Sequence, residues 1–366
     1  MTRASRSLRT IRHILVAALA YGALVAGAAA DTLPRVHVLA TGGTIASVQP
    51  DEADAYYRAA LSGEQLVDAV PQLARVAKLT AQQVANIGSQ NMSNQVWRDL
   101  AAAVRSAAAD DAVDGIVITH GTDTMEETAY FLSLVIDATK PIVLVGAMRP
   151  ATAPGADGPA NLYDAVTVAT HEGARGRGPL IVMNGEIHAA RGVTKTNTLA
   201  PDTFASPDRG RIGVVQSGEA RWFETAGTTR HTTRSEFAGF DAPLDEWPRV
   251  AIVYSHANFD GTPIRTLAAN DYDGVVLAGV GEGNTSDPGI EAIRAAIASG
   301  VAVVRSSRVG SGFVTRRDSP DDPDSDAKIG SVAALDLNPQ KARILLMLAL
   351  TRTKDSAALQ RYFDEY

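Results

Sequence analysis

The sequence predicts an α/β fold with two domains: a larger N-terminal domain with a mostly parallel sheet flanked by helices, and a smaller parallel α/β domain at the C-terminus. Short apolar runs rich in Val and Ile alternate with stretches of helical spacing, which is typical of such sheets. The alternation fades between residues 205 and 247 and then resumes. Two runs, residues 114–119 and 273–278, resemble each other, and each enters a glycine-rich loop. We therefore expect two sheets joined by a linker.

The first thirty residues have the pattern of a secretory signal peptide. Four arginines precede an apolar run over residues 14–25, and three alanines at 28–30 resemble a cleavage site. The run is short for a membrane span, which needs about 20 strongly apolar residues. We therefore expect an exported protein, periplasmic in a Gram-negative source. Removal of four arginines and no acid would take the net charge from −7 to −11.

The composition excludes several kinds of chemistry. The chain of 366 residues is 45% hydrophobic and 20% charged, which suits a soluble globular protein of one large or two medium domains. It has no cysteine, so disulfides, thiolate nucleophiles and zinc–thiolate sites are excluded. The net negative charge argues against a nucleic-acid partner, because such proteins usually carry a basic face. The seven histidines form no H-x-x-x-H pair, and we expect neither metal nor cofactor.

The N-terminal domain is expected to span residues 31–221. Apolar residues at helical spacing, such as Leu66, Val70 and Leu73, indicate its helices, and short β-rich runs indicate its strands. The expected strands cover residues 36–40, 115–119, 141–146 and 180–183, and the expected helices cover residues 64–77, 94–109, 125–137 and 161–170.

Residues 222–246 are expected to link the domains, because this segment has little apolar periodicity, contains Pro243 and is followed by Pro248. The C-terminal domain is expected to span residues 247–366. Its predicted strands cover residues 250–254, 274–278 and 301–305, and its predicted helices cover residues 290–299 and 339–352.

Two hydroxyl-rich loops follow buried strands of the N-terminal domain. They read "ATGGT" (40–44) and "THGTDT" (119–124). The second loop alone has an ordinary interpretation, because Thr or Asp is a common helix N-cap and acids in the first turn suit the helix dipole. In an open parallel sheet, however, ligands bind beyond the carboxyl ends of the strands. Glycines let backbone N–H groups approach a ligand, and a helix N-terminus favours anions. Together the loops predict a site for a small anionic substrate.

A threonine in such a loop is a candidate nucleophile. A Thr hydroxyl is weakly nucleophilic and needs a base, for which a buried Lys or a Tyr is a candidate. Lys195, in "GVTKTNT", lies among Thr and Gly rather than beside acids, although it is also compatible with a solvated loop lysine.

Other motifs carry less weight. The chain has no G-x-x-x-x-G-K-[ST] and no G-x-S-x-G, and "AGVGEGN" (278–284) lacks the spacing of a dinucleotide-binding loop. The acidic stretch "DSPDDPDSD" (318–326) contains two prolines that break the spacing of a calcium loop, so we expect a solvated loop there.

The threonine loops resemble the signatures of the asparaginase/glutaminase family, and in particular of secreted (type II) bacterial L-asparaginases. "ATGGTIAS" (40–47) resembles the first signature, and "GIVITHGTDTMEETAYFL" (115–132) resembles the second almost residue for residue. The resemblance covers residues 34–366. It also includes "NIGSQNM" (86–92), "VGAMRP" (145–150), "DGPANLYDAV" (157–166), "VTKTNT" (193–198), "VVRSSRVGSG" (303–312) and "LNPQKARILL" (337–346).

The resemblance implies a catalytic role at matched positions. It implies that Thr44 is the nucleophile that attacks a side-chain amide, and that Tyr56, on a mobile flap over the site, helps to shift its proton. Counting forward from Thr44 favours Tyr57 instead of Tyr56. The implied second catalytic group, in which the lysine activates a threonine, consists of Thr122, Asp123 and Lys195.

The resemblance also implies how the substrate is held. Its α-carboxylate and α-amino group would contact Ser89, Gln90 and Asp123, and Ala147 would lie near the departing amide. Asn284, in "GVGEGN", matches a residue that reaches the site of a neighbouring subunit. The family is usually a homotetramer of intimate dimers, which implies that a monomer is inactive.

One position departs from the family pattern. A Glu commonly precedes the "D-x-K-x-G" stretch and bonds to the flap Tyr across the subunit interface. The matching segment "DSPDDPDSDAKIG" (318–330) has no Glu, so Asp322 or Asp324 would have to serve with a shorter reach.

Three functions are compatible with the sequence. The first is hydrolysis of L-asparagine with some L-glutamine activity. The second is a glutaminase-asparaginase of near-equal preference, since one extra methylene is worth only about 1–3 kcal/mol in such a pocket. The third is an exported amino-acid-binding protein, which would need neither Thr44 nor Lys195 for chemistry.

Overall fold

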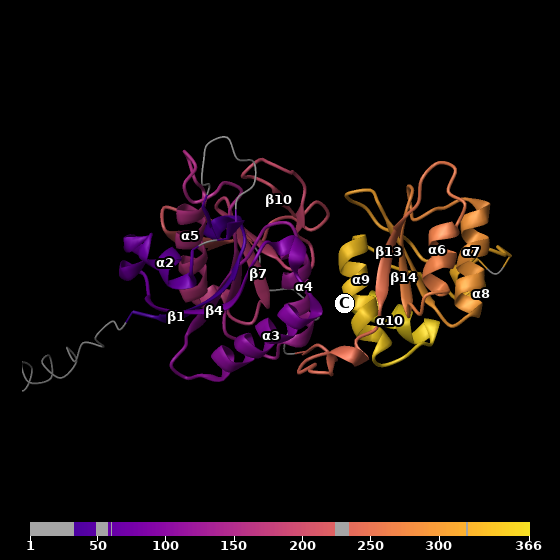
Figure 1. Cartoon of the computed structure of the whole chain (residues 1–366), viewed down its shortest axis with the longest axis horizontal. Helices are drawn as coiled ribbons and strands as arrows, with labels where there is room; N and C mark the ends of the chain where they lie inside the picture. Colours follow the sequence, from indigo (N-terminus) through magenta and orange to yellow (C-terminus); the bar gives the residue numbers. More distant parts are fainter. Residues whose placement is uncertain (1–32, 49–57, 60, 224–233, 320) are drawn as a thin grey trace, which may run out of the picture.

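The computed structural model describes residues 33–48, 58–59, 61–223, 234–319 and 321–366. In this part of the chain, two α/β units lie side by side, each with its own sheet (Figure 1). The expected α/β fold with a larger and a smaller sheet is confirmed. The predicted signal peptide, residues 1–30, lies outside the described residues, as do Tyr56 and Tyr57.

The larger sheet has eight strands in the order β12-β11-β8-β7-β6-β5-β1-β4. The neighbours from β4 to β7 pair in parallel, and β8, β11 and β12 add an antiparallel edge. These strands are β1 (Arg35–Gly42), β4 (Lys78–Ile87), β5 (Gly115–Thr119), β6 (Ile142–Val145), β7 (Pro179–Met183), β8 (Glu186–Ala189), β11 (Gly213–Gln216) and β12 (Glu219–Trp222).

Helices cover both faces of this sheet. Figure 1 shows α2 and α5 on one side and α3 and α4 on the other. Strand β5 is buried along its whole length between these layers, which explains its unbroken run of apolar residues. The helices are α2 (Gly63–Asp68), α3 (Asn94–Ala109), α4 (Met125–Val135) and α5 (Gly158–Thr170).

The smaller sheet has four parallel strands in the order β13-β14-β15-β16. Helices α6, α7 and α8 cover its outer face, and α9 and α10 lie on the face turned toward the larger unit (Figure 1). Ten of the twelve residues of α9 are buried, because this helix packs against both β14 and α4. The elements are β13 (Val250–Tyr254), β14 (Gly274–Gly279), β15 (Ala302–Ser307), β16 (Val332–Ala333), α6 (Thr262–Ala268), α7 (Asp287–Ala298), α8 (Asp326–Ile329), α9 (Pro339–Leu350) and α10 (Ser356–Glu365).

Short elements complete the chain. They are the 3-10 turns η1 (Thr44–Ala46), η2 (Pro71–Arg75), η3 (Ser89–Asn91), η4 (Glu172–Ala174) and η6 (Leu244–Glu246), and the two-residue strands β2 (Ser47–Val48), β3 (Arg58–Ala59), β9 (Thr194–Lys195) and β10 (Phe204–Ala205). No helix in the described ranges is long and apolar enough to cross a membrane.

Most predicted elements are confirmed within a few residues, but the predicted helix over residues 64–77 is wrong. It ends at Asp68, and η2 begins at Pro71. Proline disfavours helical geometry in the residue before it, and Val70 is accordingly non-helical, with φ −124° and ψ 74°. The sequence prediction also missed β4 and the β11–β12 hairpin. The predicted domain limits stay a prediction; β12 ends at Trp222 and β13 begins at Val250.

The expectation of a solvated loop over residues 318–326 is wrong at its last two residues, because Ser325 and Asp326 are both buried. Asp326 is 4% exposed and forms a two-pronged ion pair with the equally buried Arg305, at 2.6 Å to Nε and 2.5 Å to Nη2. Burial by itself raises the pKa of Asp326, but hydrogen bonds from Arg305 and Ser331 outweigh it and hold the pKa below its usual value. The carboxylate therefore anchors its loop to β15.

We predict that Arg305→Met lowers the free energy of unfolding by about 3–5 kcal/mol, because it leaves the Asp326 carboxylate buried without its counter-ion. Urea unfolding at pH 7 measures the change. The double variant Arg305→Met/Asp326→Leu is the matched control and should regain much of the loss. A single variant as stable as the parent protein would contradict the prediction.

Candidate active site

A cavity of about 550 Å³ opens at the carboxyl ends of β1, β4 and β5. Each strand delivers one loop to it, as expected for an open parallel sheet. The predicted site residues that line it are Thr44, Ser89, Gln90, Thr122, Asp123 and Lys195. A second cavity, of about 630 Å³, lies at the opposite end of the same strands, beside Arg35 and Lys78, and none of the predicted site residues lines it.

The loops after β1 and β5 touch through their glycines. Gly43 has a φ of +83°, and a Cβ atom added to it would lie 2.3 Å from the backbone nitrogen of Gly121. A Cβ atom on Gly121 would in turn lie 2.6 Å from the hydroxyl of Ser89. Only glycine fits these two positions, and the close approach places Thr44, Ser89 and Thr122 around one cavity.

Lys195 links two of the predicted catalytic residues. Its Nζ donates hydrogen bonds to Thr122 Oγ1 at 2.9 Å and to Asp123 Oδ1 at 2.6 Å. The Lys195 side chain is 16% exposed, whereas that of Asp123 is 60% exposed. Lys195 is therefore a held side chain rather than a solvated loop lysine, and the Asp123 carboxylate remains open to a ligand.

Hydroxyl groups fix the loops to one another. Thr41 Oγ1 donates to Thr119 O at 2.8 Å, which joins the ends of β1 and β5. Thr124 Oγ1 donates to Ser89 O at 2.8 Å, which ties η3 to the loop after β5. Ser47 Oγ donates to Gly43 O at 2.9 Å. These short bonds hold three loops in one arrangement before any ligand arrives.

The sequence prediction missed His120, which lies between the two predicted catalytic loops. Its Nδ1 contacts Gly121 O at 2.7 Å and its Nε2 contacts Thr128 Oγ1 at 2.9 Å. Trp97 Nε1 donates to the same hydroxyl at 2.9 Å, so Thr128 has its own proton left for His120. This arrangement makes Nδ1 the protonated nitrogen and fixes the carbonyl of Gly121. A His within "THGTDT" was the sequence signal for this role.

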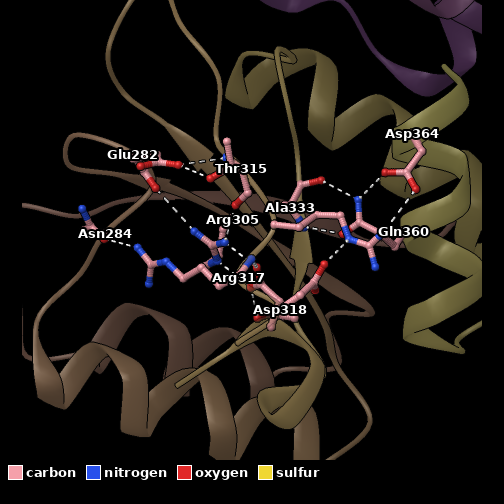
Figure 2. A network of polar contacts seen from close by, with 12 residues as sticks. Glu282, Asn284, Arg305, Thr315, Arg317, Asp318, Ala333, Gln360 and Asp364 are labelled. Carbon is pink, nitrogen blue, oxygen red and sulfur yellow. Dashed lines mark hydrogen bonds and ion pairs between the residues drawn. The ribbon is translucent and has the colours of Figure 1, made fainter. Parts of the chain in front are cut away.

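Two predicted substrate-binding residues do not line the cavity. Ala147 is fully buried after β6, and its neighbour Met148 reaches the cavity instead. Asn284 belongs to the smaller unit, where it pairs with Val280. Figure 2 shows its amide oxygen bound by Arg317.

The two acids predicted to replace the family's interface Glu have partners within the chain. Asp324 Oδ1 lies 2.5 Å from Arg294 Nη2, and Asp322 Oδ1 accepts a hydrogen bond from the backbone of Asp324 at 2.8 Å. Glu282, two residues before Asn284, accepts a hydrogen bond from Thr315 Oγ1 in the same network (Figure 2).

Within the described ranges, no three His, Asp or Glu side chains are grouped to hold a metal ion.

Comparison with known proteins identifies the family. Residues 35–227 match the model of the asparaginase N-terminal domain, and residues 249–363 match the glutaminase/asparaginase C-terminal domain. The chain belongs to the asparaginase family. This assignment agrees with the structure, because both threonine loops lie within the matched N-terminal domain and line the cavity.

The relatives of this chain are named either L-asparaginase or glutaminase-asparaginase. A probable periplasmic L-asparaginase of Haemophilus influenzae is 45% identical over 94% of the chain and 97% of its own length. L-asparaginase 2 of Escherichia coli is 46% identical over 95% of the chain and 98% of its own length. A glutaminase-asparaginase of Pseudomonas fluorescens is 45% identical over 91% of each.

We predict that His120 makes the stability of this protein fall at acid pH. Burial lowers the pKa of His120 from 6.5 to about 4, so only the unfolded chain binds its proton between these values. The free energy of unfolding should fall as the pH drops through this window, by about 3 kcal/mol in total. Urea unfolding between pH 7 and pH 4, at one protein concentration, measures it. His120→Gln should flatten this part of the curve; an equally steep curve would contradict the assignment.

Proposed function

We propose that the chain hydrolyses the side-chain amide of L-asparagine to L-aspartate and ammonia, with lesser activity on L-glutamine. The observation that carries the proposal is the hydrogen-bonded group of Thr122, Asp123 and Lys195 in the cavity that Thr44 also lines. Amide hydrolysis needs a nucleophile, a route for its proton and donors for the oxyanion, and these residues supply candidates for the first two. The E. coli and H. influenzae relatives named L-asparaginases support this choice.

In this mechanism, Thr44 Oγ1 attacks the amide carbon and its proton passes toward the flap tyrosine, Tyr56 or Tyr57. Gly43 N–H already donates to Ile87 O at 2.9 Å, so other backbone N–H groups of the loop that carries Thr44 would stabilise the oxyanion. Collapse of the intermediate breaks the C–N bond, and the nitrogen takes a proton and leaves as ammonia. Water then cleaves the Thr44 ester, which releases aspartate and restores the hydroxyl. Lys195 and Thr122 exchange a proton through their 2.9 Å contact during these steps.

The substrate is held by its α-groups. The exposed carboxylate of Asp123 suits the α-ammonium, while Ser89 and Gln90, at the end of β4, suit the α-carboxylate. A cavity with both a carboxylate and several neutral donors accepts a zwitterionic amino acid better than a simple amide.

The active assembly is proposed to be a homotetramer of intimate dimers in which Asn284 of one subunit completes the site of another. The position of Asn284 in the smaller unit, away from the cavity lining, supports this part of the proposal. We further propose export to the periplasm. The arginine-led apolar N-terminus and the word "periplasmic" in the name of the H. influenzae relative support it.

The alternative within the same reaction is a glutaminase-asparaginase of near-equal preference. The P. fluorescens relative with that name is as similar to this chain as the L-asparaginases are. The two substrates differ by one methylene, which changes the binding free energy in such a pocket by only about 1–3 kcal/mol.

We predict that the mature chain, residues 31–366, releases ammonia faster from asparagine than from glutamine. Both substrates are compared at equal low micromolar concentration in a coupled ammonia assay. A preference of about tenfold or more corresponds to the worth of one methylene in a fitted pocket. Comparable rates would make the chain a glutaminase-asparaginase, and release from neither substrate would refute the proposed function.

We predict that Thr44→Val reduces ammonia release by at least about a thousandfold while the variant stays folded, because the nucleophilic oxygen is lost. The same change at Thr266, exposed on α6, is the matched control and should leave the rate unchanged. Isothermal titration with asparagine separates turnover from binding. Full turnover by Thr44→Val would exclude Thr44 as the nucleophile, and binding without turnover by the parent protein would indicate an amino-acid-binding protein.

A further inference from the structure

The strand that carries Lys195 is very short, and hydrogen bonds of its own unit flank it, from Val193 N to Ala189 O at 3.3 Å and from Thr196 N to Thr203 O at 2.7 Å. It is the two-residue strand β9, which pairs with the equally short β10. Two-stranded pairs of this kind are marginal in isolation. Contacts from other parts of the chain can therefore add to the support of the Lys195 side chain and of its contact to Thr122.

The first turn of α9, in the other unit, supplies that support. Lys341 is 2% exposed, and its Nζ donates to Arg191 O at 3.0 Å and to Val193 O, two residues before Lys195. Asn338 Nδ2 donates to the hydroxyl of Thr194 at 3.3 Å, while its side-chain oxygen caps α9 at the Lys341 nitrogen. Three anchors, at residues 191, 193 and 194, thus precede Lys195.

The same helix also holds the element that follows Thr122 and Asp123. Gln340 Nε2 lies 2.5 Å from Glu126 Oε1, and Arg343 Nη2 lies 3.3 Å from Glu127 Oε2. Both acids belong to the first turn of α4. One turn of α9 therefore contacts both segments that meet in the Lys195–Thr122 hydrogen bond.

We propose that the first turn of α9, through Lys341 and Asn338, positions Lys195 against Thr122 and Asp123. Lys341 touches no substrate; it acts through the backbone of residues 191–193. The inference rests on the proposed function in so far as Lys195 takes part in the reaction. It gives the smaller unit a part in the catalytic geometry of its own chain, separate from any contribution of Asn284 to a neighbour.

Lys341→Met tests the proposal. It removes both hydrogen bonds of Nζ while keeping a long apolar side chain, so the segment before Lys195 loses two of its three anchors. Since a displacement of about 1 Å can cost up to about a hundredfold, kcat for asparagine should fall at least about tenfold. KM should change less than kcat, because Ser89 and Gln90 are not held by α9. A crystal structure should show Lys195 Nζ beyond hydrogen-bond distance of Thr122 Oγ1.

Gln360→Leu is the matched control. Gln360 is also a buried polar side chain of the smaller unit with two bonds to one backbone segment, at 2.8 and 3.1 Å to Ala333 (Figure 2). This variant should lower the melting temperature yet leave kcat within about twofold, because it does not touch β9. An equal fall of kcat in both variants, or an unchanged kcat in Lys341→Met, would overturn the proposal.

The proposal can still be tested if Lys341→Met does not fold or if the parent protein releases no ammonia. If Lys341→Met does not fold, Thr194→Val removes the Asn338 contact without disturbing the cap of α9; a fall in kcat of about two- to fivefold supports the proposal, and an unchanged kcat overturns it. If the parent protein releases no ammonia, the proposed function fails. The crystal structure of Lys341→Met then decides, since an unmoved Lys195 would overturn the positioning role.

Discussion

The close approach of Gly43 to Gly121 is the constraint on which the rest of the site depends. The two loops come from neighbouring parallel strands, so their starting points are already close. Any side chain at either glycine would push the loops apart, because the added atom would lie within 2.6 Å of backbone or of Ser89. The cavity, its hydroxyl groups and the contact of Lys195 with Thr122 all presuppose this approach.

Hydrogen bonds between buried polar groups keep the site rigid. Thr128 accepts from Trp97 and binds His120, which in turn fixes the carbonyl beside the Thr122 loop. Burial disfavours the protonated form of His120 and therefore lowers its pKa. The same principle operates in the smaller unit, where Arg305 and Asp326 neutralise each other. These networks define one loop arrangement rather than many.

The position of α9 explains how the smaller unit supports the site of the larger unit. This helix lies on the inner face of the smaller sheet and against α4, so its polar first turn meets the segments around Lys195 (Figure 1). Its apolar remainder joins the two units through a continuous core. The smaller unit is thus a support for the site of the larger one, even though it does not line the cavity described above.

The sequence by itself determined the fold class, most of the helices and strands, and the two threonine loops, because burial imposes local patterns that can be read along the chain. It did not reveal the antiparallel edge at β11 and β12, the break at Pro71, or the burial of Asp326. The break at Pro71 is a local effect of proline, whereas the burial of Asp326 against Arg305 and the hydrogen bonds of Lys341 to the segment before Lys195 join residues far apart in the chain. A local pattern shows that a side chain will be buried, but only the tertiary structure decides which partner satisfies it.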